Sequence, residues 1–360
     1  MLAENHPSQP SLADKIEFLM RGDAYHPPVA KVSRHETHMS DVFLVGDQVY
    51  KLKKPVRFPY LDFSTLARRE AACRAELQLN RRLAPGIYRE VVPLVHSAQG
   101  LAIGGDGTVV DWLVVMKRLD EEQMLDRVIS EGRLQSWQLD RLAAVLVPFY
   151  RRAGPVFVAP AVQAAELWRS LAYNRRVLLD PRFQLPAGSI HYIDAMQRQF
   201  LTARAELLAE RARTRHIVDG HGDLRPEHIH LGDPVLIIDC LEFNPRLRMV
   251  DPLDEIAFLC VECERLGAAW AGEYLRRRVV HVFHDGASEE VFVFYKSHRA
   301  TLRARLAIAH LLEPNPRTPE KWAPLARTYL HLAAAAALTL ERSLRRPADR
   351  SRSRRRACDE

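Results

Sequence analysis

Cysteine is scarce in this sequence, with five residues that are odd in number and scattered along 360 positions. A secreted disulfide scaffold carries closely spaced, paired cysteines, so the pattern excludes that class and favours a reducing compartment. Long apolar runs are also missing. The longest, Leu332 to Leu340, is far shorter than the roughly 20 residues of a membrane span. The first residues show no secretory signal. We therefore expect a cytoplasmic protein that does not enter a membrane.

The dipeptide Gly-Lys does not occur anywhere in the chain, which excludes a phosphate-binding loop of the G-x-x-x-x-G-K-[ST] type. The formal net charge is +7, and a large part of it lies in an Arg- and Ser-rich tail, residues 345–360. This tail contains no aromatic residue on which a base would stack. It supports at most a non-specific attraction to phosphates, so we expect no specific nucleic-acid partner.

The first half of the chain has the pattern of a small β-rich lobe. Two apolar runs, Val42–Val45 and Gln48–Leu52, are separated by Gly46-Asp47, a two-residue turn signal that predicts a hairpin. A helix capped by Ser64 is expected up to about Leu83. Further strands are expected over 91–95 and 109–117.

From Asp120 onwards the apolar spacing is helical, and Gly188–Arg213 is expected to form one such helix. A short β-like island, Ile217 to Asp251, interrupts the helices. Cys260 and Cys263 fit two buried thiols on a helix face better than a metal site, because no second pair follows them. The predicted fold is α+β and two-lobed, divided into an N-terminal arm (1–30), a β-rich lobe (31–119), a helical lobe (120–345) and a basic, disordered tail (346–360).

Acidic residues are concentrated between Asp219 and Glu264, where eleven acids stand against three bases. Within this segment, Asp223 follows a Gly in a polar loop, and Asp239 ends an apolar strand about sixteen residues later. Phosphoryl transfer needs one carboxylate to orient or deprotonate the attacking hydroxyl and a second to hold Mg²⁺ on the nucleotide phosphates. The two aspartates fit these roles.

The residues around both aspartates resemble a known family. The run His221-Gly222-Asp223-Leu224 followed by Ile237-Ile238-Asp239 is similar to the catalytic and metal-binding segments of aminoglycoside phosphotransferases and their relatives, which share the protein-kinase fold. Val42–Leu61 and Asp239–Asn244 resemble the kinase-like N-terminal module of bacterial bifunctional aminoglycoside phosphotransferase and ATP-binding proteins. The resemblance covers roughly residues 30–345. Longer relatives add a P-loop ATPase domain, so this chain looks like the stand-alone module.

The resemblance implies a kinase-like two-lobed fold and assigns roles to individual residues. Asp223 matches the catalytic base, Asp239 the metal-binding aspartate, and Lys51 the strand lysine on the α- and β-phosphates. Glu76, or alternatively Glu70, would be the ion-pair partner of this lysine.

The nucleotide-binding residues follow from the same resemblance. The hinge, 115–119, would meet the adenine through its backbone, at Met116 and Arg118. The stretch Glu36–Ser40 takes the place of the phosphate-covering turn, where Ser40 or Thr37 would supply a hydroxyl.

Lysine usage independently favours Lys51. The chain has 44 Arg but only 8 Lys, and three of these are Lys51, Lys53 and Lys54. A compact ammonium suits a phosphate site that does not demand the fork geometry of Arg. Alternation along a strand puts Lys51 and Lys53 on one face and Lys54 on the other. Lys53 is therefore the second choice, and a solvated basic strand edge is the alternative.

One position departs from the family pattern. Kinase-like proteins usually have Asn five residues after the catalytic Asp, as the second metal ligand, and here that residue is His228. Mg²⁺ prefers oxygen ligands, whereas imidazole suits Mn²⁺ and transition metals better. His228 is thus either a ligand of an altered metal site, with Glu242 or water assisting, or the mark of a degenerate one.

The sequence as a whole predicts an ATP- and Mg²⁺-dependent phosphotransferase, with Mn²⁺ as an alternative metal, acting on a hydroxyl of a small molecule. The competing hypothesis is a degenerate kinase-like module that binds a nucleotide or a partner without turnover. His35, Glu36 and His38 are interpreted as loop residues rather than a metal cluster.

Overall fold

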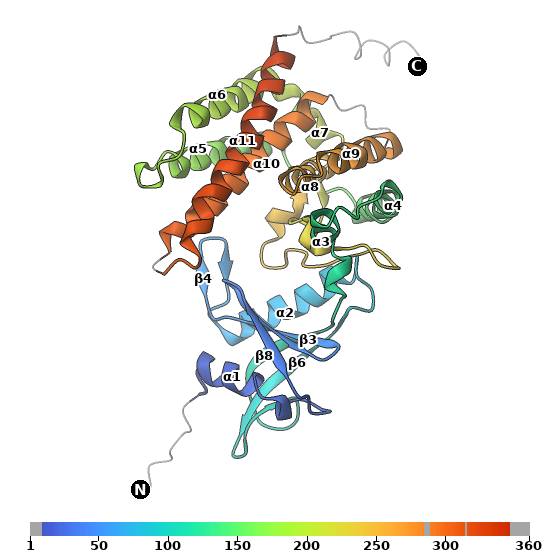
Figure 1. Ribbon diagram of the computed structural model, residues 1–360, viewed down its shortest axis with the longest axis vertical. Helices are drawn as coiled ribbons and strands as arrows, with labels where there is room; N and C mark the ends of the chain where they lie inside the picture. Colours follow the sequence, from blue (N-terminus) through green and yellow to red (C-terminus); the bar gives the residue numbers. More distant parts are fainter. Residues whose placement is uncertain (1–8, 284–288, 314, 346–360) are drawn as a thin grey trace. The chain divides into compact units, whose positions relative to one another are not determined.

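A computed structural model describes residues 9–283, 289–313 and 315–345. The predicted tail, 346–360, and the first eight residues of the predicted arm lie outside these ranges. The chain forms two compact units. The N-terminal unit contains residues 9–128 together with His221–Asp223 and Glu227–Arg248, and the helical unit contains the remainder (Figure 1).

The N-terminal unit is built on a six-stranded antiparallel sheet of order β1-β2-β3-β8-β6-β7. The predicted hairpin is confirmed, because β2 and β3 pair around Gly46-Asp47 with Val45 opposite Gln48. The helices and strands of this unit are α1 (Leu12–Leu19), β1 (Val32–Glu36), β2 (Ser40–Val45), β3 (Gln48–Lys53), β4 (Arg57–Phe58), β5 (Leu61–Asp62), α2 (Leu66–Asn80), β6 (Tyr88–Ser97), β7 (Gly100–Ile103), β8 (Thr108–Lys117), β10 (Ile229–His230) and β11 (Leu236–Ile237).

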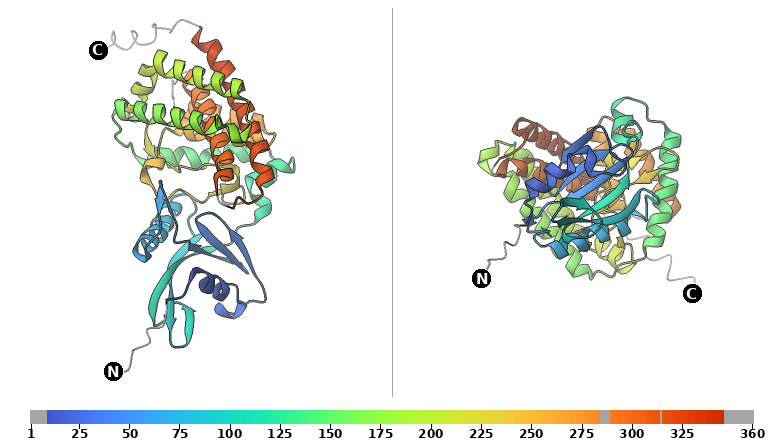
Figure 2. Two further views of the ribbon diagram at one scale, coloured as in Figure 1. Left: turned by 90° about the vertical axis from the view of Figure 1, so that its left-hand side faces the viewer. Right: turned by 90° about the horizontal axis from the view of Figure 1, so that it is seen from below.

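Strand alternation gives this sheet two different faces, each covered by one helix (Figure 2). On β3, Leu52 belongs to the apolar cluster that includes Leu19 of α1. Val49 belongs to the cluster on the other face, together with Cys73 of α2. Lys51 and Lys53 lie two and four residues after Val49 and therefore on the same face of β3, so they point towards α2. The strand pattern thereby brings two ammonium groups to one helix.

A buried ion triad fastens α1 and α2 to the sheet. The carboxylate of Asp111 on β8 accepts from Lys15 Nζ at 2.8 Å and from Arg69 Nε at 2.7 Å. All three side chains are at least nine-tenths buried. Charges removed from water in this way are tolerated when each finds its partner, so the first helix is part of this unit rather than a loose extension.

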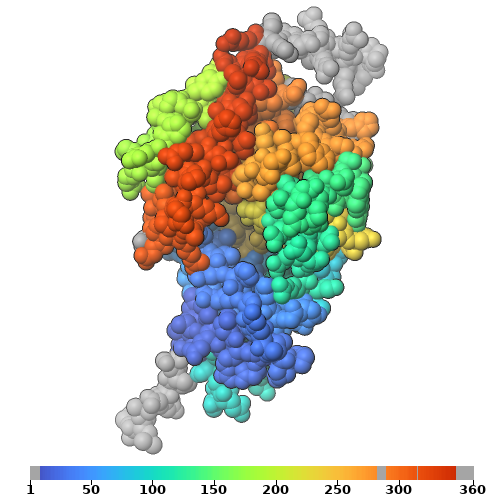
Figure 3. Space-filling model, in the orientation of Figure 1, coloured from blue at the N-terminus to red at the C-terminus, as the bar shows by residue number. Residues whose placement is uncertain are grey.

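The helical unit has its core between helices α5, α6, α8, α10 and α11, with Tyr329, Leu330 and Phe183 among its buried side chains. Figure 3 shows α11, in red, running along the surface of this unit. The elements are α4 (Ser136–Ala153), α5 (Pro160–Leu178), α6 (Ala187–Ala203), α7 (Ala205–Arg213), β9 (Val218–Asp219), β12 (Met249–Val250), α8 (Pro252–Arg265), α9 (Ala269–Phe283), α10 (Glu289–Ala309) and α11 (Pro319–Leu344), while α3 (Leu125–Ser130) spans the boundary between the units.

Two local predictions were wrong. The single helix expected over 188–213 is broken at Arg204, whose backbone (φ −126°, ψ 23°) leaves the helical region between α6 and α7. Helix α2 is capped by Thr65 rather than Ser64. The Thr65 side chain accepts from the amide of Arg68, whereas the Ser64 hydroxyl donates to Asp62.

Among the described residues, no helix is long and apolar enough to cross a membrane. Cys260 and Cys263 are buried thiols of α8 and form no disulfide, which agrees with their interpretation as core residues.

Replacing Asp111 by Ala should destabilise the protein by about 3–5 kcal/mol, because Lys15 and Arg69 are then left buried without their carboxylate. Urea unfolding monitored by circular dichroism measures this loss. Asp23, which pairs with Arg21 at the surface, provides the control. Asp23→Ala should cause no measurable change, since exposed ion pairs contribute little. Equal effects of the two substitutions would contradict the role assigned to the triad.

Candidate functional site

The centre of the site is a carboxylate shared by two lysines. Glu76 Oε1 lies 2.8 Å from Lys51 Nζ, and Glu76 Oε2 lies 2.6 Å from Lys53 Nζ. Lys51 also reaches Asp239 Oδ1 at 2.8 Å. The structure therefore brings together three residues that the sequence singled out. Glu70, the alternative partner, instead pairs with Arg74 on the helix surface.

Burial and charge act in opposite directions on this cluster. Burial disfavours the ammonium of Lys51, but Asp239 and Glu76 outweigh it and raise the lysine pKa. Burial likewise disfavours the carboxylate of Glu76, but Lys51 and Lys53 outweigh it and lower the pKa of that carboxyl. Lys51 and Glu76 are therefore both ionised, and the positive charge of Lys51 faces Asp239.

The segment around Asp239 follows β11 and is anchored through its backbone. The Asp239 amide donates to Tyr88 Oη at 3.1 Å, and the Cys240 amide donates to Asn80 Oδ1 at 2.9 Å. Asp239 has a left-handed backbone with φ of 61°. A residue other than glycine keeps such a conformation only when its surroundings enforce it, and such positions concentrate at functional sites.

The loop carrying Asp223 has a rigid frame of its own. Gly222 has φ of 87°, and a Cβ there would lie 3.0 Å from the Leu247 carbonyl, so glycine is required. His221 is fully buried, donates from Nε2 to the Ile238 carbonyl, and accepts the Asp223 amide at Nδ1. Burial lowers the pKa of His221 to about 4. It is thus a neutral residue that holds the loop in place.

His228 lies between the two aspartates. Its Nδ1 donates to the Asp223 carbonyl at 2.9 Å, and its Nε2 lies 3.5 Å from Asp239 Oδ2. Because a carbonyl only accepts, Nδ1 carries a proton, and Nε2 is the ring atom that faces the carboxylate. An imidazole nitrogen and a carboxylate oxygen that face each other are a donor set suited to a divalent cation. The residues present therefore fit a metal.

The turn predicted to cover the phosphates connects β1 to β2. Thr37 Oγ1 accepts the amide of Ser40 at 2.9 Å, and Ser40 itself is buried. Lys54 Nζ contacts Glu36 Oε1 at 2.5 Å and the Thr37 carbonyl at 2.7 Å. The alternative of a solvated basic strand edge is therefore wrong, because the third lysine of the run fastens this turn.

The predicted hinge lies at the end of β8. Met116 is almost fully buried in the apolar cluster of Val49, Ile87 and Leu236. The Arg118 amide donates to the Asp47 carbonyl at 2.7 Å, and its side chain pairs with Glu121 at the surface. Met116 therefore belongs to an apolar wall, whereas the Arg118 amide already has a partner.

Sequence reasoning missed residues that hold this site together. Asn80 is fully buried four positions after Glu76, on the same face of α2, and this helical spacing was a signal for it. Glu242 was expected to assist a metal, but its Oε1 contacts Lys53 Nζ at 2.5 Å. Burial raises the pKa of Glu242. Tyr88 had no signal in the sequence, since it meets Asp239 only through the fold.

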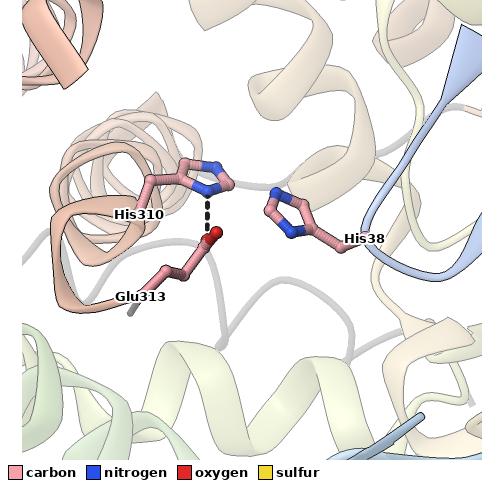
Figure 4. Close-up of side chains that lie close together, drawn as sticks. All are labelled: His38, His310 and Glu313. Atoms are coloured by element: carbon pink, nitrogen blue, oxygen red, sulfur yellow. Dashed lines mark hydrogen bonds and ion pairs between the residues drawn. The ribbon is translucent and has the colours of Figure 1, made fainter. Parts of the chain in front are cut away.

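A histidine and an acid also meet in the helical unit. His310 Nδ1 lies 2.8 Å from Glu313 Oε1 (Figure 4). The His310 ring stacks on Trp322, with the ring centroids 3.9 Å apart. The pair closes the turn after α10.

Comparisons with known proteins support the fold described above. No family model matches the chain. It is 33% identical over 285 residues to uncharacterised proteins of Mycobacterium tuberculosis and Mycobacterium bovis. The match covers 78% of this chain, which spans about half, 55%, of the length of these relatives.

Solved structures with a similar fold are kinases of small molecules. A choline/ethanolamine kinase family protein from Mesorhizobium loti matches with a TM-score of 0.51 and 18% identity, over 88% of this chain and 93% of that one. Choline kinase from Cryptosporidium parvum matches with a TM-score of 0.51 and 8% identity, over 87% and 89%. The chain therefore has the two-lobed, protein-kinase-like fold predicted from its resemblance to aminoglycoside phosphotransferases and their relatives.

Proposed function

We propose that the protein is an ATP-dependent phosphotransferase that acts on a hydroxyl group of a small molecule. The observation that carries this proposal is the contact of Lys51 with both Glu76 and Asp239, with His228 between Asp239 and Asp223 in the same unit. A fixed ammonium beside two carboxylates is the arrangement that phosphoryl transfer requires.

The nucleotide phosphates are proposed to meet Lys51 on one side and the Glu36–Ser40 turn on the other. The Thr37–Ser40 hydrogen bonds and Lys54 hold that turn in one shape. The base is proposed to lie against apolar side chains at the end of β8. Val49, Met116 and Leu236 form a buried cluster there, with Leu119 and Ile238 packed against it.

Asp239 and His228 are proposed to hold the metal, Mg²⁺ or Mn²⁺, which when bound would neutralise charge on the phosphates. The side chain of Asp239 is 44% exposed and that of His228 only 8%. Asp239 is thus the accessible ligand, while the ring is fixed by its hydrogen bond to the Asp223 carbonyl.

Asp223 is proposed to orient the acceptor hydroxyl and take its proton. Its side chain is 24% exposed, and the buried His221 holds its backbone amide. A positioned carboxylate of this kind acts through orientation and proton acceptance, not by forming a bond to phosphorus. The acceptor is proposed to bind to helices within 120–345, and the nucleotide to 31–119. The chain is also proposed to correspond to the kinase-like N-terminal module of bacterial bifunctional aminoglycoside phosphotransferase and ATP-binding proteins.

A degenerate module that binds nucleotide without turnover is the second candidate. The observation favouring it is His228 itself, which stands where the resemblance places an amide oxygen. Thermal shift with ATP, alone and with Mg²⁺ or Mn²⁺, followed by a phosphorylation screen of hydroxyl compounds, separates the two. Stabilisation by metal–ATP without transfer to any acceptor would favour the degenerate module.

Asp223→Asn should leave nucleotide binding nearly intact and lower turnover by about 10²–10⁴-fold, since a positioned base commonly contributes this much. Binding is measured by calorimetry with a non-hydrolysable ATP analogue, and turnover by ADP release with the acceptor found in the screen. Asp219→Asn, an acid four residues earlier, is the control. Wild-type turnover in Asp223→Asn would remove this residue from the catalytic role.

The metal dependence should be unusual because of His228. Mn²⁺ should support activity at least as well as Mg²⁺, and His228→Asn should shift the preference towards Mg²⁺, since an amide oxygen replaces a nitrogen ligand. Activity is titrated against each metal for both proteins. A strong Mg²⁺ preference that is unchanged in His228→Asn would place this residue outside the metal shell. Activity that arises only in the Asn variant would favour the degenerate module.

A further inference from the structure

The segment Asp239–Asn244, here called the metal loop, is held by a lysine that the proposed reaction does not use. Lys53 Nζ contacts Glu242 Oε1 of this loop at 2.5 Å and Glu76 Oε2 of α2 at 2.6 Å. The side chain of Lys53 is 1% exposed and that of Glu242 is 8% exposed. One buried ammonium therefore connects the sheet, the helix and the metal loop.

The surroundings of Lys53 leave its charge no access to solvent. Its Nζ lies 5.0 Å from the centre of the Phe63 ring, and Glu76 is fully buried. A buried charge that loses one partner is strongly unfavourable, because water does not replace the missing group. Displacing Glu242 from Lys53 is thus costly, and this fixes the position of the loop three residues after Asp239.

The next residue of the metal loop is a second anchor. Phe243 packs against the cluster of Leu61, Phe63 and Ala72, and its ring centre lies 6.1 Å from that of Tyr60. Tyr60 lies in the turn between β4 and β5, the short hairpin that joins β3 to α2. Two consecutive residues of the metal loop are therefore fixed by the segment that begins at Lys53.

These anchors bear on Asp239 because its backbone is left-handed, with φ of 61°. A position of this kind persists only while the surrounding structure enforces it. On one side the Tyr88 hydroxyl accepts the Asp239 amide. On the other side Asn80 accepts the Cys240 amide, and the loop beyond it is held through Glu242 and Phe243. Loss of the Glu242 and Phe243 contacts would leave only the two backbone anchors, so that Asp239 would leave more easily the conformation in which it faces Lys51 and His228.

We propose that Lys53 is a positioning residue, which holds the metal loop through Glu242 so that Asp239 faces His228 without any activating event. This inference rests on the proposed function of Asp239 as a metal-binding residue. Lys53 acts through Glu242 and touches neither nucleotide nor acceptor. The ion pair is formed within one compact unit, so the metal loop is ordered before ligands arrive.

The order of the metal loop is measured without any ligand by thiol labelling of Cys240. Cys240 follows Asp239 directly and is 2% exposed. Lys53→Met and Glu242→Gln should raise its labelling rate by about tenfold or more, because local opening of the loop then becomes easier. Peptide mass spectrometry assigns the label to Cys240 among the five cysteines. Cys73 of α2, also buried, should stay protected and so reports that the unit remains folded.

Two controls and the second variant keep this test decisive. Lys53→Arg should restore protection of Cys240, because it keeps the charge. Lys31→Met, at an exposed lysine, should change nothing. If Lys53→Met also exposes Cys73, that variant has unfolded, and the labelling rate of Cys240 is then measured in Glu242→Gln. Wild-type protection of Cys240 in both Lys53→Met and Glu242→Gln would overturn the proposal.

The consequence for the site is measured by Mn²⁺ titration with a non-hydrolysable ATP analogue. Lys53→Met should weaken Mn²⁺ binding by about 10–100-fold, as expected when a group that orients a metal ligand is lost. Wild-type Mn²⁺ affinity in Lys53→Met would overturn the positioning role alone. A wild-type protein that binds neither Mn²⁺ nor the nucleotide would overturn the proposed function, and the metal-positioning role with it.

Discussion

The fully buried carboxylate of Glu76 is the constraint on which the rest of this site depends. A carboxylate without water needs compensation by charge and hydrogen bonds, and Glu76 receives both from Lys51 and Lys53 on one face of β3. Alternation along the strand makes it possible for two lysines to reach one acid. Each lysine also forms an ion pair with a second acid, Lys51 with Asp239 and Lys53 with Glu242. One strand and one helix thus determine where the metal loop lies.

Helix α2 contributes to this arrangement twice. Asn80, one helical turn after Glu76, accepts the amide of Cys240 and donates to the Glu76 carbonyl. The helix therefore holds the metal loop by a side chain–backbone bond as well as through the lysines. The ion triad around Asp111 fixes the same helix to β8, the strand that pairs with β3. Rigid support of this kind suits the proposed phosphoryl transfer, a reaction in which a protein contributes mainly position and charge.

The sequence allowed prediction of the lobes and the hairpin, because these follow from local periodicity, and short motifs singled out the candidate site residues. Lys51, Asp223 and Asp239 stand in such motifs, and the structure brings Lys51 to Asp239. The ion pair of Lys53 with Glu242 was not predicted. The partners are separated by 188 residues, and the local sequence around either residue gives no indication of the other. The break at Arg204 was also missed, because apolar periodicity continues through it. Contacts between residues that only the fold brings together cannot be predicted from the spacing of residues within a short segment.

In the proposed function, Asp239 and His228 form the metal-binding part of a nucleotide site organised by Lys51. Crystals grown with Mn²⁺ and a non-hydrolysable ATP analogue test it directly, because anomalous scattering locates manganese without reference to the protein coordinates. We expect a manganese peak within ligand distance of Asp239 Oδ2 and His228 Nε2, with a phosphate oxygen on Lys51 Nζ. Manganese bound elsewhere, or a nucleotide whose phosphates do not contact Lys51, would contradict it.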